Sequence, residues 1–380
     1  MHMPKTAEML CFVVLIAARA GAADRPLGLS VNADGVLCKD SRPYRGIGVN
    51  YLDCFSRTLR KPGDTSYEQG FAVLRELGIP FARFMACGYW PDDMKLYFQD
   101  KEAYFRLMDG VVKSAEKHEV GLIASLFWFS STVPDLVKES RDQWGNPASK
   151  THEFMRRYTQ EVVTRYKDSP AIWGWELGNE YSLEGDLPNA AEHRPPVVGI
   201  LGTPATRTAR DDLSHEMLRM AYVEFARAVR QHDAHRMITS GNAFPRPTAW
   251  HQWRENNWKQ DSPEQYAQML LGDNPEPMDV ISVHGYGQVD IAPTLQIAQA
   301  AKRPLFVGEF GVSGTDERAR EQFGAMLGWV ERQAVPLAAL WVYDYAGQNG
   351  QWNVTASNER SYQLKAVAEA NRRLRGAGGR

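Results

Sequence analysis

Short apolar segments with the character of β-strands recur eight times along the chain, and this repetition constrains the fold more than any other feature. The segments lie near residues 44, 79, 120, 171, 235, 279, 304 and 336. The stretches between them have helical apolar periodicity, as in "SYEQGFAVLRELG" and "EMLRMAYVEFARAVRQH". Eight strand-helix repeats over roughly 300 residues predict an α/β fold, a single-domain (β/α)8 (TIM) barrel with long βα loops.

An open, doubly wound sheet is the structural alternative. Such a sheet often carries a glycine-rich phosphate-binding loop after a strand, and no predicted strand here is followed by one. The long irregular segments, 129–150, 182–210 and 241–262, each follow a predicted strand. In a barrel these loops lie together at the C-terminal face, so we expect the functional site there.

The N-terminal residues have the features of a signal peptide. Lys5 precedes an apolar stretch from about Met9 to Ala18, and small residues follow it up to Ala23. This stretch is too short for a permanent bilayer anchor. We therefore expect a signal peptide over 1–22, the barrel over 23–375, a flexible tail over 376–380, and a secreted or periplasmic protein. No later segment contains eighteen consecutive apolar residues, so none is predicted to span a membrane.

The overall charge and the cysteine count limit the partners and the covalent cross-links. Forty-four basic and forty-six acidic residues give a net charge of −2, which provides no basic footprint for nucleic acid. Eleven Trp, fifteen Tyr and fifteen Phe are compatible with a carbohydrate-binding cleft. Beyond the signal peptide only Cys38, Cys54 and Cys87 remain, so at most one disulfide is expected.

Two carboxylates stand where predicted strands end. Glu180 follows the fourth strand and Glu309 lies at the end of the seventh. Three strands apart in a ring of eight, they are expected to face each other across the mouth of the barrel. Carboxyl groups about 5 to 5.5 Å apart suit retaining glycoside hydrolysis, one as nucleophile and the other as acid and then base. Their mutual repulsion would keep one of them protonated toward neutral pH.

Polar residues on the neighbouring strands are expected to surround this pair. The period-two pattern places Ser282, His284 and Tyr286 on one face, toward the barrel interior. We expect Tyr286 to hydrogen-bond the nucleophile and Trp341 to stack on a sugar ring. An arginine such as Arg83 near Glu309 would keep that carboxylate ionised.

A third carboxylate competes for that arginine. By alternation Glu176 points into the barrel, where an internal arginine such as Arg83 or Arg45 would satisfy it. If Arg83 is taken up by Glu176, its support of Glu309 weakens.

At the ends of strands four, six, seven and eight, the strings "WELGNE", "HGY", "VGEFG" and "LWVYDY" resemble the clan A glycoside hydrolases, most closely family 5. The resemblance spans about 30–345. It implies a cofactor-independent retaining β-glycosidase with Glu180 as acid/base, Glu309 as nucleophile and Asn179 on the sugar 2-hydroxyl. It also assigns substrate-binding or supporting roles to Asn50, Arg83, Trp128, His284, Tyr286 and Trp341.

Two features depart from the family 5 pattern. Tyr181 follows Glu180 where cellulases commonly have proline, and "SLFWFS" stands where they have a histidine. "WELGNE" with Trp128 is more similar to the β-mannanase branch. The expected substrate is therefore a β-mannan or a β-glucan, cleaved either within the chain or from its end by an exo-acting enzyme.

Other classes of function are less consistent with the sequence. A non-catalytic carbohydrate-binding barrel would be expected to lack one of the two glutamates, and both are present. A metal-dependent hydrolase would show clustered His and Asp at strand ends, but only His284 lies there, and His232 and His235 lack a third ligand. We therefore expect no metal. The remaining tryptophans that could form sugar platforms are Trp90, Trp144, Trp250, Trp253, Trp258 and Trp352.

Overall fold

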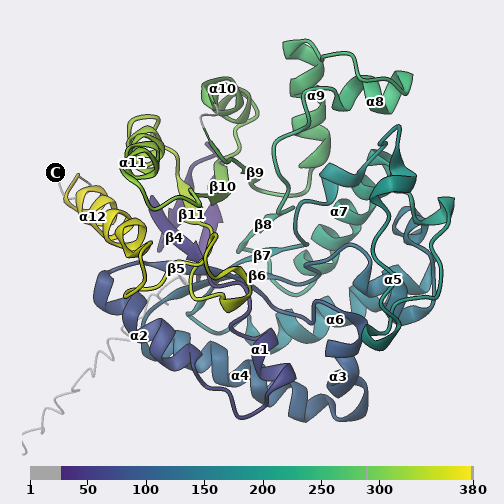
Figure 1. Cartoon of the computed structure of the whole chain (residues 1–380), viewed down its shortest axis with the longest axis horizontal. Coiled ribbons are helices and arrows are strands. Elements are labelled where there is room, and N and C mark those ends of the chain that lie inside the picture. Colours follow the sequence, from purple (N-terminus) through teal and green to yellow (C-terminus); the bar gives the residue numbers. More distant parts are fainter. Residues whose placement is uncertain (1–26, 288–289, 378–380) are drawn as a thin grey trace, which may run out of the picture.

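The computed structural model describes residues 27–287 and 290–377, and in it the eight predicted strands form one parallel sheet (Figure 1). Their order around the sheet is β8-β7-β6-β5-β4-β11-β10-β9. The strands are β4 (Gly46–Asn50), β5 (Phe81–Met85), β6 (Gly121–Ser125), β7 (Ile172–Glu176), β8 (Met237–Thr239), β9 (Ile281–His284), β10 (Leu305–Phe310) and β11 (Leu337–Leu340).

Backbone bonds between β8 and the start of β9 bring the two edges of the sheet together. The N–H groups of Asp279 and Val280 donate to the Ile238 carbonyl at 3.0 and 3.3 Å, and Ile238 N–H donates to the Asp279 carboxylate at 2.7 Å. The sheet is therefore nearly closed, and the predicted (β/α)8 barrel is confirmed. Because all eight strands run parallel, their C-terminal ends meet at one mouth.

A major helix follows each strand and packs around the barrel (Figure 1). Five of these helices begin after a Ser or Asp whose side chain accepts a backbone N–H, a cap that stabilises a helix by about 1 kcal/mol. The helices are α2 (Tyr67–Leu77), α4 (Lys101–Lys117), α6 (Lys150–Tyr166), α7 (His215–Arg230), α9 (Pro263–Asp273), α10 (Ala292–Ala300), α11 (Glu317–Arg332) and α12 (Ser361–Ala377).

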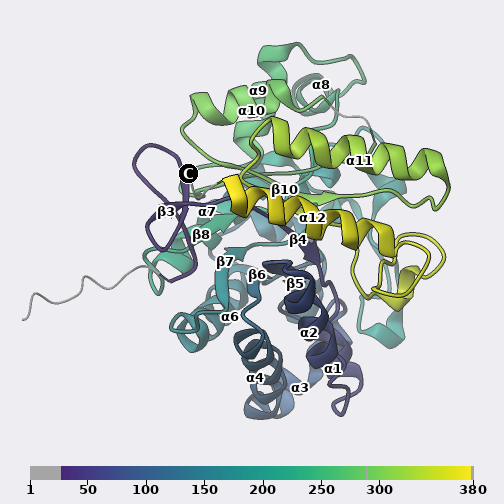
Figure 2. The ribbon, with the colours of Figure 1, turned by 90° about the vertical axis from the view of Figure 1, so that its left-hand side faces the viewer.

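A small antiparallel sheet, which the apolar pattern of the sequence does not indicate, covers the N-terminal end of the barrel. It consists of β1 (Leu29–Val31), β2 (Leu37–Lys39) and β3 (Arg42–Pro43). Leu29 and Leu37 pack with Phe81, Trp173 and other buried residues from the starts of the barrel strands. Figure 2 shows this sheet at the opposite end of the barrel from the loop between β11 and α12. It therefore leaves the mouth open.

The long loops after β6 and β7 contain short helical turns and are joined to each other by ion pairs. Arg207 in the second loop binds Asp135 in α5 (Thr132–Val137) at 2.7 Å, and both side chains are buried. Arg141 pairs with Glu184, again across the two loops. Short 3-10 turns in these loops occupy 141–145, 181–184, 190–193, 199–201 and 209–211.

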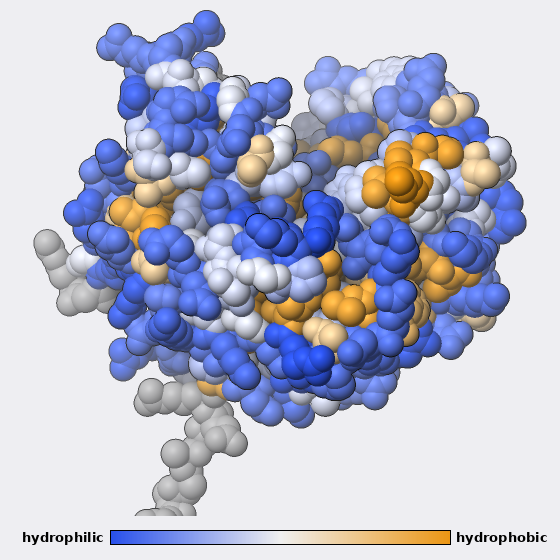
Figure 3. All heavy atoms as spheres, turned by 60° about the horizontal axis from the view of Figure 1, so that its bottom comes forward, coloured by the Kyte–Doolittle hydropathy of each residue, from blue (hydrophilic) through white to orange (hydrophobic). Residues whose placement is uncertain are grey.

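The face of the molecule shown in Figure 3 is mostly hydrophilic, with apolar residues gathered in a few patches.

Several expectations about the ends of the chain concern residues outside the described part. The predicted signal peptide over 1–22 lies there, as do 378–380 of the predicted tail, whereas α12 includes 376–377. Within the described residues no helix is long and apolar enough to cross a membrane. Cys38, Cys54 and Cys87 are all buried and unpaired, so no disulfide joins them.

Candidate active site

The two glutamates lie on opposite sides of the barrel mouth, at different depths. Glu309 is part of β10, and only 4% of its side chain is exposed. Glu180 lies four residues beyond the end of β7, and 31% of its side chain is exposed. The barrel thus presents one carboxylate in its wall and a second, more accessible one on the rim.

His284 at the end of β9 joins the two carboxylates. Its Nδ1 lies 2.9 Å from Glu180 Oε1 and 3.5 Å from Glu309 Oε1. One oxygen of each glutamate and this nitrogen all lie within 4.8 Å of one another. Among the described residues these three side chains form the one cluster with metal-ligand spacing, and neither His232 nor His235 belongs to it.

Arg83, fully buried on β5, connects the interior of the barrel to the site. Its Nε donates to both oxygens of Glu176 at 2.8 and 3.0 Å, while Nη1 donates to Glu309 Oε1 at 2.9 Å. The two carboxylates that were expected to compete for this arginine therefore share it. Arg45 does not contribute, because it donates to backbone carbonyls of residues 330, 331 and 335.

Two asparagines orient the Arg83 guanidinium. Asn50 Oδ1 accepts from Nη1 at 2.9 Å, and Asn179 Oδ1 accepts from Nη2 at 2.8 Å. Asn50 is completely buried, and its amide nitrogen donates to the Gly308 carbonyl at 2.9 Å. In this structure Asn50 thus touches Arg83 and the backbone beside Glu309, whereas Asn179 lies beside Glu180.

Both oxygens of Glu309 are held by hydrogen-bond donors. Arg83 binds Oε1, and the Tyr286 hydroxyl donates to Oε2 at 2.5 Å, the contact expected from the sequence. A carboxylate held at both oxygens has a fixed orientation, so the Glu309 side chain is held in one position at the mouth of the barrel.

Burial and neighbouring charges alter the proton affinities of the site. Burial raises the pKa of Glu180, and Arg83 opposes the rise. Burial and the charge of Glu180 raise the pKa of Glu309. His284, Arg83 and the hydrogen bond from Tyr286 act in the opposite direction and lower it, but the net shift is upward. Arg83 was expected to keep Glu309 ionised, but it offsets only part of the effect of burial. For Glu180, burial rather than repulsion by Glu309 is the main cause. Burial lowers the pKa of His284 to about 4, so its imidazole is neutral at neutral pH.

Aromatic side chains surround the polar cluster. The Arg83 guanidinium lies 4.4 Å from the ring centre of Trp128, which stacks on Trp341 with 6.3 Å between the ring centres. The Trp341 indole N–H donates to Gln348 at 2.9 Å. Trp352 contacts the ring of Tyr286 edge-on, with 5.2 Å between the ring centres. Trp352 is therefore an additional tryptophan that the fold brings to the site, through a loop contact that no sequence spacing indicates.

Other tryptophans have different surroundings. Trp144 is fully buried and donates to the Ser130 carbonyl at 2.8 Å, so it packs the loop after β6. Trp258 is 55% exposed on the loop after α8 (Ala249–Glu255). The Trp253 ring packs against the guanidinium groups of Arg219 and Arg254.

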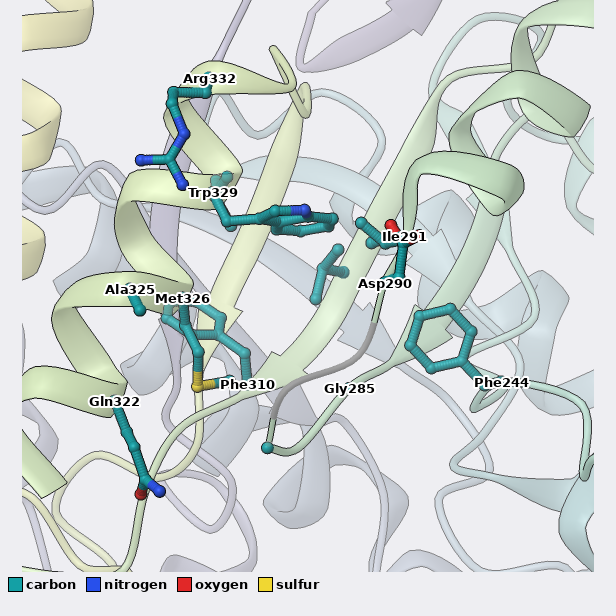
Figure 4. Close-up of a pocket in the computed structure, with 13 residues that line it drawn as sticks. Phe244, Gly285, Asp290, Ile291, Phe310, Gln322, Ala325, Met326, Trp329 and Arg332 are labelled. Atoms are coloured by element: carbon teal, nitrogen blue, oxygen red, sulfur yellow. The ribbon is translucent and has the colours of Figure 1, made fainter. Parts of the chain in front are cut away.

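A separate apolar pocket of about 460 Å³ lies beside α11 (Figure 4). Trp329 of α11 and Phe244 of the loop after β8 face it from opposite sides, with Ile291 between them. Neither Glu180 nor Glu309 lines this pocket. The chemistry-bearing groups therefore lie elsewhere, at the barrel mouth.

The sequence of the barrel also matches the profile of a known enzyme family. Residues 61–347 match the sequence profile described as cellulase, glycosyl hydrolase family 5. The chain belongs to glycosyl hydrolase family 5. The match covers most of the barrel and confirms the resemblance deduced from the strand-end motifs.

Individual curated proteins are similar to parts of the chain. A protein of Aspergillus flavus named probable mannan endo-1,4-beta-mannosidase F is 32% identical over 182 residues, 42% of this chain and 36% of its own length. A protein of the same species, probable mannan endo-1,4-beta-mannosidase A, is 30% identical over 30% of this chain and 34% of its own length. The chain thus spans about a third of the length of these curated relatives.

A solved structure shares the fold over most of its length. The endo-1,4-beta-mannanase of Rhizomucor miehei superposes with a TM-score of 0.64 at 18% identity, covering 91% of this chain and 99% of that one. At this identity the likeness establishes the barrel architecture.

Proposed function

We propose that this family 5 barrel is a retaining β-glycoside hydrolase that cleaves a β-mannan. The observation that carries the proposal is the pair of glutamates held with His284, one oxygen of each within 4.8 Å of the other. This spacing leaves no room for a water between the carboxylate and the sugar on the nucleophile side, so it suits direct attack by one carboxylate.

The different surroundings of the two glutamates support different roles. Glu309, buried and held at both oxygens, is suited to be the nucleophile, because a fixed carboxylate needs little reorganisation to attack. Glu180 is suited to be the acid that protonates the departing oxygen, because it is the more exposed of the two and, among the described residues, has no arginine or tyrosine hydrogen bond to stabilise its ionised form, while burial raises its pKa.

Two displacement steps then complete the reaction. In the first, Glu309 attacks the anomeric carbon while Glu180 gives its proton to the glycosidic oxygen, which leaves with its sugar and produces a glycosyl ester on Glu309. In the second, ionised Glu180 takes a proton from water, the water oxygen attacks the anomeric carbon, and the carboxylate of Glu309 is released.

The choice of β-mannan rests on the named activity of the relatives, mannan endo-1,4-beta-mannosidase. The presence of both glutamates in one cluster favours an enzyme over a non-catalytic carbohydrate-binding barrel. Trp341, partly exposed and stacked on Trp128, is suited to pack against the apolar face of a sugar ring beside the glutamates.

Product release from a panel of β-mannans, β-glucans, xylan and galactans tests the substrate and the mode of cleavage. We expect β-mannan to release oligosaccharides from within the chain, faster than any other polymer. Release of mannose alone would indicate an exo-acting enzyme, and hydrolysis of glucan but not mannan would contradict the proposed substrate.

The pH dependence of turnover provides a separate prediction. The acid form of Glu180 is needed for the first step, and its pKa is raised by burial. Thus kcat/KM should fall as pH rises through a midpoint above the ordinary carboxyl value of 4.5. In Glu180→Ala, assayed with a substrate whose leaving group needs no proton, this alkaline decline should disappear. A decline that persists unchanged in the variant would assign it to another group.

A further inference from the structure

We propose that Asn242 is a positioning residue for the acid/base glutamate, acting together with the carbonyl of Gly241. Both residues lie on the loop that follows β8, and neither belongs to the strand-end motifs of the site. The inference rests on the proposed two-glutamate mechanism and adds a residue that controls where the Glu180 carboxyl lies.

The backbone of Glu180 adopts a conformation that needs outside support. Its φ and ψ are 56° and 26°, in the left-handed region that residues with a Cβ seldom occupy. Such a conformation persists only where surrounding contacts impose it. Because the direction of the side chain follows from the backbone, the contacts that hold this turn also aim the carboxyl group at the mouth of the barrel.

The loop after β8 supplies contacts to Glu180 and to the residues just after it. The N–H of Glu180 itself donates to the Gly241 carbonyl at 2.9 Å. Two residues later, the N–H of Ser182 donates to Asn242 Oδ1 at 3.1 Å. The preceding N–H, of Asn179, is held by the Trp128 carbonyl at 3.0 Å. The turn is thus held at residues 179, 180 and 182, and the partners of the last two lie on the loop after β8.

Asn242 is itself held firmly enough to serve as a support. It is completely buried, and Oδ1 also accepts from the Tyr222 hydroxyl of α7 at 3.0 Å. Its amide nitrogen donates to the Asp273 carbonyl at the end of α9 at 2.7 Å. These partners fix which end of the amide faces Ser182, since only the oxygen can accept from an N–H and a hydroxyl.

Gly241 allows the loop to approach the Glu180 segment closely. Its φ is +75°, and a Cβ placed there would lie 1.9 Å from the Gly178 carbonyl oxygen and 2.8 Å from Cδ of Glu176. Any side chain would push the loop away from the residues that precede Glu180. The glycine is therefore required for the contact that Asn242 completes.

The test compares the activity of Asn242→Ala on two substrates, one with a poor leaving group and one with a good leaving group. Without the acceptor for Ser182 the Glu180 carboxyl should shift, so proton delivery fails while the nucleophile is unaffected. We expect kcat on an unactivated oligosaccharide to fall about 100-fold, the effect of a displacement of roughly 1 Å. For a dinitrophenyl glycoside, whose leaving group needs no proton, the fall should be much smaller, and KM for the oligosaccharide should change little.

A matched variant separates positioning from general loss of stability. Asn371 of α12 is also buried, and its side chain binds the backbone of β4: Oδ1 accepts from Ile47 N–H at 3.0 Å and Nδ2 donates to the Ile47 carbonyl at 2.7 Å. Its remaining hydrogen bond is to the Val367 carbonyl, so its side chain makes none to the loop after β8 or to the segment 176–183. Asn371→Ala should therefore lower the melting temperature but keep the wild-type ratio of activity on the oligosaccharide to activity on the dinitrophenyl glycoside.

The variant Asn242→Asp retains an oxygen for Ser182 but loses the donor to the Asp273 carbonyl, so its melting temperature should fall while its ratio of activities stays near that of the wild type. If Asn242→Ala does not fold, the near-isosteric Asn242→Leu provides the same comparison.

Two results would overturn the inference: a wild-type ratio of activities in Asn242→Ala or Asn242→Leu, or an equally altered ratio in Asn371→Ala. The variant Glu180→Ala separates this failure from failure of the proposed function. If Glu180→Ala shows the dependence on leaving group and the Asn242 variants do not, only the role of Asn242 is wrong. If Glu180→Ala does not show it, the assignment of Glu180 as the acid/base is wrong as well.

Discussion

Replacing Glu309 with glutamine should reduce turnover of every substrate by about 10⁴-fold or more, because the variant has no carboxylate to form the glycosyl ester. Activated substrates should not restore it, since a good leaving group cannot replace the missing nucleophile. Initial rates on mannan and on a dinitrophenyl glycoside, measured side by side, check both statements.

The Glu309→Gln variant should still fold. Glutamine has nearly the same shape, an amide oxygen can accept from Arg83 or Tyr286, and Arg83 retains its pairing with Glu176. The melting temperature should therefore stay close to that of the wild type. The exposed Glu321 of α11 provides the control, since Glu321→Gln should change neither rate nor melting temperature. Substantial activity in Glu309→Gln would contradict its assignment as nucleophile.

Replacing Glu180 with alanine should reduce hydrolysis of mannan by about 10²- to 10⁴-fold, the usual contribution of general acid catalysis. A dinitrophenyl glycoside should still form the ester rapidly on Glu309, because its leaving group departs without a proton. The ester should then accumulate, since no base remains to activate water.

Added azide provides a diagnostic measurement for the same variant. Azide is a small anion that needs no general base, and it can occupy the space left by the Glu180 side chain. We expect azide to accelerate turnover of the activated substrate and to yield a β-glycosyl azide, the product of two inversions. Equal losses on both substrates, with no response to azide, would contradict the role of Glu180 as acid/base.

The barrel and the meeting of its strand ends could be predicted from sequence for a physical reason. In a closed parallel sheet every strand end reaches the same mouth, so the positions of Glu180, His284 and Glu309 along their strands suffice to predict their proximity. The period-two pattern of β9 likewise indicated that Tyr286 would lie toward the barrel interior, and in the structure its hydroxyl donates to Glu309.

Features that depend on loop contacts could not be predicted in this way. The strands β1 to β3 are two or three residues long, too short for an apolar alternation to identify them. Arg83 could be assigned to Glu176 or to Glu309 from alternation, but only the three-dimensional arrangement shows one guanidinium reaching both. The link from Asn242 to Ser182 joins two loops sixty residues apart, and no local pattern marks it.

The most direct test of the central claim is to trap the glycosyl ester with an activated 2-deoxy-2-fluoro-β-mannoside. The fluorine slows both steps, and the good leaving group restores the first, so the ester accumulates. Mass spectrometry of the intact protein and of its peptides should find one fluoro-sugar, attached to Glu309. Labelling of Glu180 or Glu176 instead, or the absence of any adduct in a preparation that hydrolyses mannan, would contradict this account.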